Sequence, residues 1–217
     1  RAAALDQAAR DAGVSLVGTG VNPGYAMDTL PLTATGVCTD VESVEVQRVV
    51  DAGARRRPLQ KKVGAGLTEA AFAEKKAAGG FGHIGLRESL RLIADGLGWP
   101  VDDIEETLEP VVAEAPVETN HVSVAEGAVA GIHHVARAQV GGRERLSLDL
   151  QMYVGADRPR DVVQVEGNPP IDLTVDGGIF GDTATVGMLV NTVPRLQNAT
   201  TGLRTMPELS IPRAVAT

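Results

Sequence analysis

A glycine-rich segment near the amino terminus contains the residues best suited to contact a ligand. It reads Gly18-Thr19-Gly20-Val21-Asn22-Pro23-Gly24 and follows a short apolar run at residues 14–17. A glycine loop between a strand and a helix can cradle a phosphate, because backbone N–H groups then approach the ligand closely. The segment nearly matches the dinucleotide fingerprint G-x-G-x-x-G, but Pro23 stands where the third glycine should permit close helix–strand packing. Two interpretations therefore remain, a cofactor contact or a tight crossover turn.

A second candidate is the basic segment at residues 51–66. Its cations are Arg55, Arg56, Arg57, Lys61 and Lys62. An arginine fork can bind a phosphate or a carboxylate with two hydrogen bonds, and the glycines at 64 and 66 would let a backbone approach closely. The alternative, which we favour, is a polar, mobile loop whose charges offset the acidic bulk of the chain.

The other titratable residues predict neither a catalytic group nor a metal site. His133 and His134 are adjacent in a predicted strand, so their side chains point to opposite faces and cannot share a metal ion. No Ser-His-Asp order and no G-x-S-x-G motif stands out. The acidic run at 102–106 is interpreted as a solvated, charged surface.

Composition restricts the class of protein. The chain has 217 residues, of which 43% are hydrophobic and 22% charged, and no apolar stretch is long enough for a membrane span. A net charge of −8 and only 3% aromatic residues disfavour a nucleic-acid partner. The single cysteine, Cys38, cannot form an internal disulfide, which favours a reducing cytoplasm.

The elements that must position these residues can be predicted from periodicity. A helix over residues 1–12 and a strand at 14–17 precede the glycine loop, and a second helix should start at about Pro23, with Asn22 as its cap and a kink at Pro31. A strand follows at 43–51. Two further helices are predicted at Thr68 to Ala78 and Arg87 to Leu97, each ending before a glycine.

The second half of the chain has the two-residue period of a sheet. Apolar and polar residues alternate from 146 to 154, and Gly141-Gly142 joins this strand to the one before it. Shorter strands are predicted at 161–166 and 170–175, and a last helix starts near residues 181–183. The fold class predicted is α+β, with a large open mixed or antiparallel sheet covered on one face by helices and helical segments at both termini.

The chain resembles a known family in several blocks that occur in the same order. These are the segment 17–30 (VGTGVNPGYAMDTL), EVQRVVDA at 45–52, LQKKVGAGL at 59–67, GHIGLRES at 82–89, and the tail from GDTAT at 181–185 to GLRTM at 202–206. In them the chain is similar to the 2,4-diaminopentanoate dehydrogenase and native amine dehydrogenase group, relatives of dihydrodipicolinate reductase.

The resemblance implies that an amino-terminal Rossmann domain is missing from this chain. Residues 1–20 would be the last helix and strand of that nucleotide-binding domain, and 21–180 the substrate and oligomerisation domain, similar to the carboxy-terminal domain of dihydrodipicolinate reductase. Residues 181–217 would be a helix and tail that return to the nucleotide-binding domain. Such proteins pair through their sheets, so a homodimer is expected.

The resemblance also implies an activity, reversible oxidative deamination of an amine or diamine with NAD or NADP. Gly20, Asn22 and Asn191 match cofactor-binding positions at the nicotinamide, while Tyr25 and Leu30 match the substrate pocket. The catalytic base is expected in the amino-terminal domain, so this chain alone should be inactive.

Other hypotheses remain open. One alternative is that the chain is a non-catalytic binding or dimerisation module of the same fold. A second is that it is a dihydrodipicolinate reductase-like enzyme. The second is disfavoured because the paired histidines and lysine of those reductases are replaced here by the segment 51–57 (DAGARRR). A third hypothesis makes residues 14–51 a degenerate nucleotide site in which Arg55 to Arg57 bind a 2′-phosphate.

Overall fold

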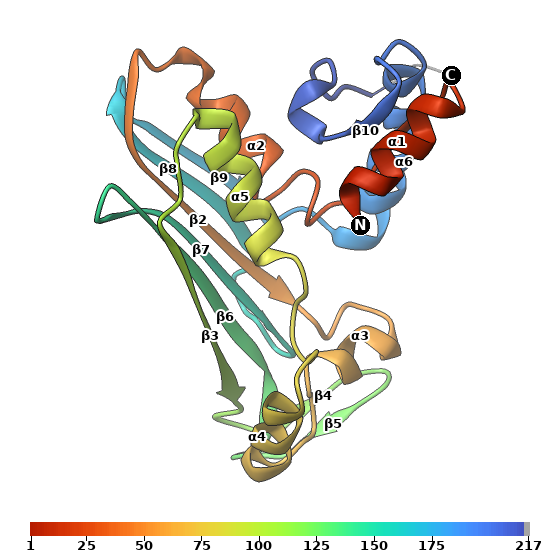
Figure 1. Cartoon of the computed structure of the whole chain (residues 1–217). Helices are drawn as coiled ribbons and strands as arrows, with labels where there is room; N and C mark the ends of the chain where they lie inside the picture. Colours follow the sequence, from red (N-terminus) through yellow and green to blue (C-terminus); the bar gives the residue numbers. More distant parts are fainter. Residues whose placement is uncertain (215–217) are drawn as a thin grey trace.

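A computed structural model describes residues 1–214 (Figure 1). The helices are α1 (Ala2–Asp11), α2 (Thr29–Ala34), α3 (Arg57–Lys62), α4 (Glu69–Ala78), α5 (Leu86–Leu97) and α6 (Gly181–Gln197), with short 3-10 turns at Thr35–Val37 and Met206–Glu208. The strands are β1 (Ser15–Val17), β2 (Asp40–Asp51), β3 (Asp103–Val112), β4 (Val117–Glu118), β5 (Ser123–Val124), β6 (Val129–Val140), β7 (Arg143–Tyr153), β8 (Arg160–Asn168), β9 (Ile171–Asp176) and β10 (Gly202–Arg204). Among residues 1–214, no helix is both long and apolar enough to cross a bilayer.

Six strands form one mixed sheet in the order β3-β6-β7-β2-β8-β9. Only the central pair β2 and β7 is parallel, and every other neighbouring pair is antiparallel. The hairpin predicted at Gly141-Gly142 joins β6 to β7, and both glycines have positive φ angles. The predicted α+β class with a large mixed sheet is therefore confirmed.

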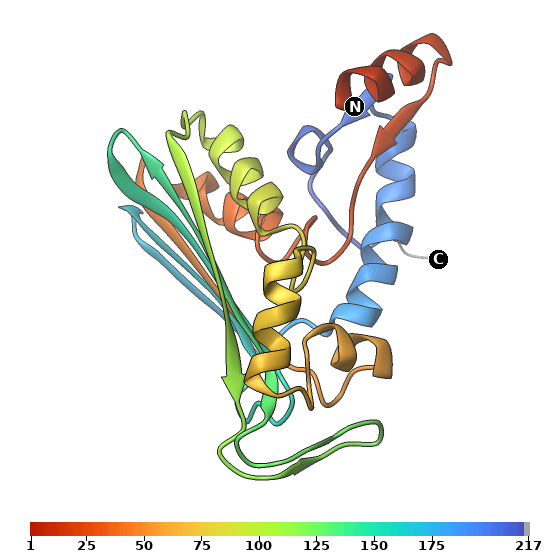
Figure 2. The same ribbon diagram turned by 60° about the horizontal axis from the view of Figure 1, so that its bottom comes forward.

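The helices that pack on this sheet all lie on one side of it (Figure 2). Alternation along β7 explains why, since Leu146, Leu148 and Leu150 are fully buried while the residues between them are half-buried. The buried face of α5, with Leu90 and Ile93, belongs to the same hydrophobic core. Polar side chains such as Gln47, Ser147 and Gln151 alternate with the buried ones and lie on the opposite face. Among residues 1–214, no helix covers that face (Figure 2).

The first and last parts of the chain form a second, smaller unit beside the sheet (Figure 1). Strand β1 pairs in parallel with β10, with Leu16 opposite Leu203, and α1 and α6 lie next to this pair. The sequence predicted β1, α1 and α6 but not β10. Three residues in a tail interrupted by prolines show too little periodicity to be recognised as a strand.

Two predicted helices occur where expected, because their ends carry strong local signals. The Thr68 hydroxyl accepts a hydrogen bond from the Ala71 N–H at the start of α4. Helix α5 ends at Gly98, which adopts the left-handed conformation. Capping of this kind is read directly from residue type.

The helix predicted from Pro23 is wrong in its start and in its cap. Residues 21–28 form successive turns, and α2 begins only at Thr29, whose N–H donates to the Asp28 side chain. Asn22 is therefore not a helix cap. Pro31 lies in the first turn of α2, where a missing N–H costs nothing.

The mobile polar loop predicted at 51–66 is also wrong. The segment contains α3, which begins with a proline in its first turn, and the Gln60 side chain on it is completely buried. Gln60 donates to the carbonyls of Gly53 and Arg55. It also accepts a hydrogen bond from Thr119, which lies between β4 and β5. These tertiary bonds order a segment whose local composition is typical of a loop.

The close approach of β6 to β7 at Gly131 leads to a test of the sheet. A Cβ atom at this position would overlap the Met152 carbonyl and the Tyr153 backbone. We expect Gly131→Ala to lower the free energy of unfolding by about 2–3 kcal/mol, since the strands must separate locally. Gly36→Ala, where an added Cβ meets nothing within 4 Å, is the control and should change it by less than about 0.5 kcal/mol. Urea denaturation measures both, and equal effects would contradict the packing argument.

Candidate functional site

The glycine loop at 18–24 connects the small unit to the sheet, and it packs on itself. Gly24 has a φ of +132°, and a Cβ there would lie 2.5 Å from the Gly20 nitrogen and 2.6 Å from the Gly20 oxygen. The space beside these glycines is thus filled by the loop's own backbone. This geometry favours the crossover-turn interpretation and does not fit a phosphate cradle.

Asp28 organises the loop, and the sequence analysis missed it. Its buried carboxylate accepts hydrogen bonds from the Gly24 N–H at 2.7 Å, the Thr29 N–H at 2.5 Å and the Ser89 hydroxyl at 2.7 Å. The bond to Ser89 ties the crossover to α5. An aspartate directly before Thr-Leu-Pro is a helix-start signal that could have identified it.

Asn22 lies in the same cluster, with its amide directed into the protein. Its Oδ1 accepts a bond from the Ser89 hydroxyl at 3.3 Å, and its Nδ2 lies 3.1 Å from the Met27 sulfur. Gly20 beside it is buried. Gly20 and Asn22, the two loop residues predicted to contact the cofactor, thus both pack within the crossover.

Tyr25 and Asn191 are placed on the same side of the molecule. Tyr25 is half-buried and packs against the small-unit cluster that contains Met188 of α6 and Met206 of the tail. Asn191 is half-buried on α6, one turn after Met188. Leu30 follows Tyr25 closely, and its N–H donates to the Tyr25 carbonyl. The structure thus brings Gly20, Asn22, Tyr25 and Leu30 together at the crossover.

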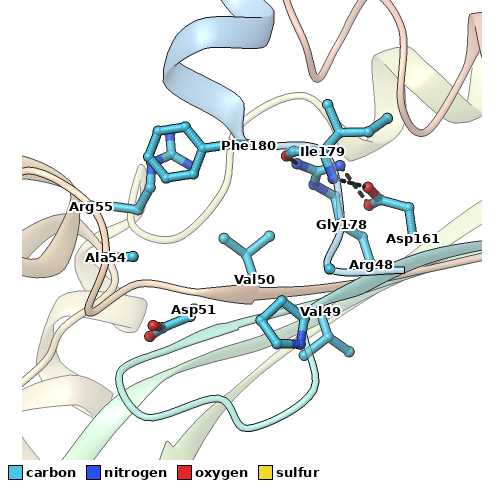
Figure 3. Close-up of a pocket in the computed structure, with 12 residues that line it drawn as sticks. Arg48, Val49, Val50, Asp51, Ala54, Arg55, Asp161, Gly178, Ile179 and Phe180 are labelled. Atoms are coloured by element: carbon cyan, nitrogen blue, oxygen red, sulfur yellow. Dashed lines mark hydrogen bonds and ion pairs between the residues drawn. The ribbon is translucent and has the colours of Figure 1, made fainter. Parts of the chain in front are cut away.

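A buried ion pair holds the linker that leads into α6 (Figure 3). Arg48 and Asp161, 3% and 2% exposed, lie 2.5 Å apart on β2 and β8. Both members of the pair also form hydrogen bonds to the backbone of one linker residue, Ile179. Arg48 donates to the Ile179 carbonyl at 2.7 Å, and the Ile179 N–H donates to Asp161 at 2.7 Å. Burial raises the pKa of Asp161, and the Arg48 guanidinium opposes this rise.

Arg55 is not the solvated loop residue that was predicted, because it is 9% exposed and paired. Its guanidinium binds the Asp182 carboxylate with two bonds, at 2.8 and 3.2 Å, and lies 5.0 Å from the centre of the Phe180 ring. The hydrogen bond from Arg55 holds the pKa of Asp182 below its ordinary value. The guanidinium of Arg55 is therefore occupied by a carboxylate of the chain itself.

Three of the four histidines lie in different environments. His133 lies on the polar face of the sheet, 3.0 Å from Asp149, whereas His134 is buried, as the strand alternation predicts. His83, in the loop before α5, has a buried Nε2 atom with no hydrogen-bond partner. Burial, followed by the positive charges of Lys62, His134 and Arg48, lowers the pKa of His83 to about 4.

This arrangement can position neighbouring segments and line a binding site, but it offers no group that is free to react. No histidine, cysteine or carboxylate cluster suited to a metal ion occurs in the described part of the chain. The strongest polar groups, Asp28, Arg48, Asp161 and Arg55, all bind other groups of the protein. They fix the crossover and the linker, which are the two connections between the sheet and the small unit.

Comparison with known proteins adds a family and a fold. The model of the "2,4-diaminopentanoate dehydrogenase C-terminal domain" matches residues 25–217. A 2,4-diaminopentanoate dehydrogenase from Acetoanaerobium sticklandii is 31% identical over 217 residues, which cover 97% of this chain and 62% of that protein. An amine dehydrogenase from Streptomyces virginiae is 23% identical over 207 residues, covering 88% of this chain and 57% of that protein.

The solved structure of an amine dehydrogenase from Mycobacterium smegmatis superposes with a TM-score of 0.83 at 22% identity. The match covers 99% of this chain and 64% of that one, and it shows that the two share a fold. The present chain therefore spans about three-fifths of the length of the relatives that it matches.

The buried imidazole of His83 leads to a pH-dependence of stability. With a pKa of about 4 in the folded protein against 6.5 in the unfolded chain, the unfolded state binds more protons between these values. Stability should therefore be complete above pH 6.5 and fall by roughly 2–3 kcal/mol as the pH drops to 4. His83→Gln should reduce this slope in urea titrations at several pH values. His121→Gln, an exposed control, should retain it, and identical slopes in both variants would contradict the assignment.

Proposed function

The chain belongs to the family of 2,4-diaminopentanoate dehydrogenase C-terminal domains, and from this premise we propose that it is the substrate-binding and oligomerisation part of an NAD(P)-dependent amine or diamine dehydrogenase. In such a protein residues 1–20 and 181–217 would complete a nucleotide-binding domain, and 21–180 would form the substrate domain. Of these ranges, residues 215–217 lie outside the part that the structure describes. Names of two relatives that match most of this chain support the activity.

The reaction proposed is oxidative deamination. A neutral amine loses a hydride from its amine-bearing carbon, which leaves an iminium ion, and water converts this ion to a ketone and ammonium. The nicotinamide supplies the hydride acceptor. The protein must hold the amine neutral and the C–H bond in line, and a base is needed to remove the ammonium proton. We place this base in the nucleotide-binding segment, because the carboxylates Asp28, Asp161 and Asp182 are already engaged within this chain.

The observation that carries the proposal is that α6 exposes apolar side chains and buries polar ones. Four apolar side chains on this helix are 51–60% exposed, namely Val186, Leu189, Val190 and Val193. Its inner face instead buries Thr192 and Arg195, together with Met188. A helix that directs its valines and leucines to solvent is typical of a surface covered by another polypeptide.

The occupant that we propose for this surface is an amino-terminal nucleotide-binding segment of the same protein. The curated relatives extend well beyond the part that matches this chain. Strand β1 pairs with β10 along one edge, and within residues 1–214 no strand pairs with its other edge. A parallel sheet that continues from β1 would cover Leu16 and the apolar face of α6 together.

We place the phosphate-binding part of the nucleotide site outside the described residues 1–214. Gly20 and Gly24 pack against each other, so they leave no cradle for a pyrophosphate. Gly20, Asn22 and Asn191 are proposed to line the nicotinamide edge, with Tyr25 and Leu30 on the substrate side. The phosphates of NAD or NADP are assigned to the docked segment, and no step of the reaction is derived from their binding here.

We further propose that two copies pair through the open face of the sheet. This face is lined by polar side chains such as Gln47, Ser147 and Gln151, and the His133–Asp149 pair lies at its centre. No helix of residues 1–214 packs on it (Figure 2).

We also propose the cytoplasmic location expected from composition, which the unpaired Cys38 supports.

The activity is tested on the protein that joins this chain to its upstream nucleotide-binding segment. We expect amine-dependent formation of NADH or NADPH, measured by absorbance, and none from the 217-residue chain alone. Val190→Glu on α6 should lower kcat/KM at least about tenfold, since it places a charge in an apolar contact. Ala73→Glu on the exposed side of α4 is the matched control and should leave kcat/KM unchanged. An unimpaired Val190→Glu enzyme would sink the docking model, and absence of turnover with every amine would sink the activity.

The dimer is tested by a substitution on the open face. Ser147→Arg adds a long cation at the centre of the sheet, and we expect it to convert the dimer to a monomer in sedimentation velocity. Ala73→Arg, on the helix side, should leave the dimer intact. A Ser147→Arg protein that still sediments as a dimer would show that the copies meet elsewhere.

A further inference from the structure

A group of exposed cations lies on α3 and directly before it. Arg56 is 75% exposed, and Arg57, Lys61 and Lys62 are exposed as well. We call these four residues the α3 patch. Within residues 1–214, the side chains of Arg57, Lys61 and Lys62 form neither a hydrogen bond nor an ion pair. Nothing in the family match or in the relatives' names assigns a role to the patch.

The α3 patch is a local exception in an acidic protein. The chain has a net charge of −8, yet residues 52–68 contain five of its 20 basic residues and no acidic residue. Half-exposed cations elsewhere pair with glutamates, as Lys76 does with Glu109 and Arg87 with Glu106. The positive field of the patch is therefore directed into solvent, where it acts on charged ligands that approach the protein.

The segment that carries the patch is held in place from below. Gln60 of α3 is completely buried and hydrogen-bonded to the residues around it. Arg55, directly before the patch, is bound to Asp182 through two hydrogen bonds. The patch thus stands on an ordered helix, where Arg57 and Lys61, four positions apart, lie on the same face.

The position of the patch connects it with the proposed cofactor. Helix α3 lies near the start of α6 (Figure 2), and Nε of Arg56 is 3.9 Å from Oδ1 of Asp182 on that helix. Burial and then the charge of Lys62 lower the pKa of His83, so this cation lies near the loop before α5. The patch therefore borders the helix on which the nucleotide-binding segment is proposed to dock.

The chemistry of the patch suits phosphate groups. Guanidinium and ammonium groups offer only N–H donors and a positive charge, which phosphate oxygens accept. NAD carries a pyrophosphate, and NADP carries a further 2′-phosphate. The acidic bulk of the chain repels such a ligand at a distance, and an unpaired positive patch near its binding site counteracts this repulsion.

We propose that the α3 patch steers the anionic dinucleotide toward the complete protein. This inference rests on the proposed function and adds a role for residues away from the nicotinamide edge. The patch acts during the approach of the cofactor, whereas the phosphates come to rest on the docked segment. Steering of this kind raises association rates by about 10- to 10³-fold and weakens with salt. The Debye length falls from about 30 Å at 0.01 M salt to about 8 Å at 0.15 M.

The rate of NADPH binding to the complete protein tests the proposal. Stopped-flow fluorescence of the reduced nicotinamide gives the association and dissociation rate constants without turnover. Between about 0.01 and about 0.15 M NaCl, we expect the association rate constant to fall at least about fivefold and the dissociation rate constant to change less than about twofold. NADH, which lacks the 2′-phosphate, should show a smaller fall. An association rate that does not respond to salt overturns the inference.

A charge reversal assigns the effect to the patch. At about 0.01 M NaCl, Lys61→Glu should lower the association rate constant for NADPH at least about fourfold and leave the dissociation rate constant unchanged. Lys61→Arg retains the charge and should keep the original rate. Arg143→Glu makes the same charge change at the β6–β7 turn, at the other end of the sheet from α3 (Figure 1), and should change the rate less than about twofold. Equal effects of Lys61→Glu and Arg143→Glu, or a change in dissociation alone, overturn the steering role.

These rates separate the inference from the proposed function. An association rate that depends on Lys61 in a protein that oxidises no amine supports the steering role and counts against the activity alone. Equal association rates in Lys61→Glu and the unaltered protein overturn the steering role while the dehydrogenase activity stands. A complete protein that binds neither NADPH nor NADH overturns both.

Discussion

The buried pair of Arg48 and Asp161 is the interaction on which the arrangement of this protein depends. A charge pair removed from water is stable only when its remaining donors and acceptors are satisfied, and here one linker residue, Ile179, satisfies both sides through its backbone. The linker therefore has one favourable position over the end of the sheet. Helix α6 starts immediately afterwards, so its direction is set by this contact. A cavity lined in part by Arg48, Asp161 and Ile179 lies at this contact.

The second connection between the sheet and the small unit is held by the same physical means. Asp28, completely buried, gathers the N–H groups of Gly24 and Thr29 and the hydroxyl of Ser89. Both connections thus end on a buried carboxylate whose acceptors are occupied. The small unit is consequently a fixed platform, which presents the apolar side chains of α6 in one orientation. A platform of this kind fits the proposed function, because hydride transfer depends steeply on geometry.

Much of the fold could be predicted from sequence because its signals are local. The alternation in β7 and the caps of α4 and α5 follow from neighbouring residues, and each occurs where expected. Arg55 shows where such reasoning ends. Its local context, three arginines before a proline, is typical of a solvated loop, yet its partner Asp182 lies 127 positions further along the chain. Asp28 and the start of α2 were missed for a related reason, since Pro23 and Asn22 imitate a helix start that the long-range bond to Ser89 overrides.

The amino-acid sequence by itself determined the α+β class, the polar and apolar faces of the sheet, and the family, because periodicity and motif order are properties of neighbouring residues. Only the tertiary structure decided which arginines pair with the protein's own carboxylates, which glycines pack against each other, and which face of α6 is left uncovered. These outcomes depend on distances between residues remote in the chain, and burial makes them energetically decisive, since burying a charge without a partner is costly.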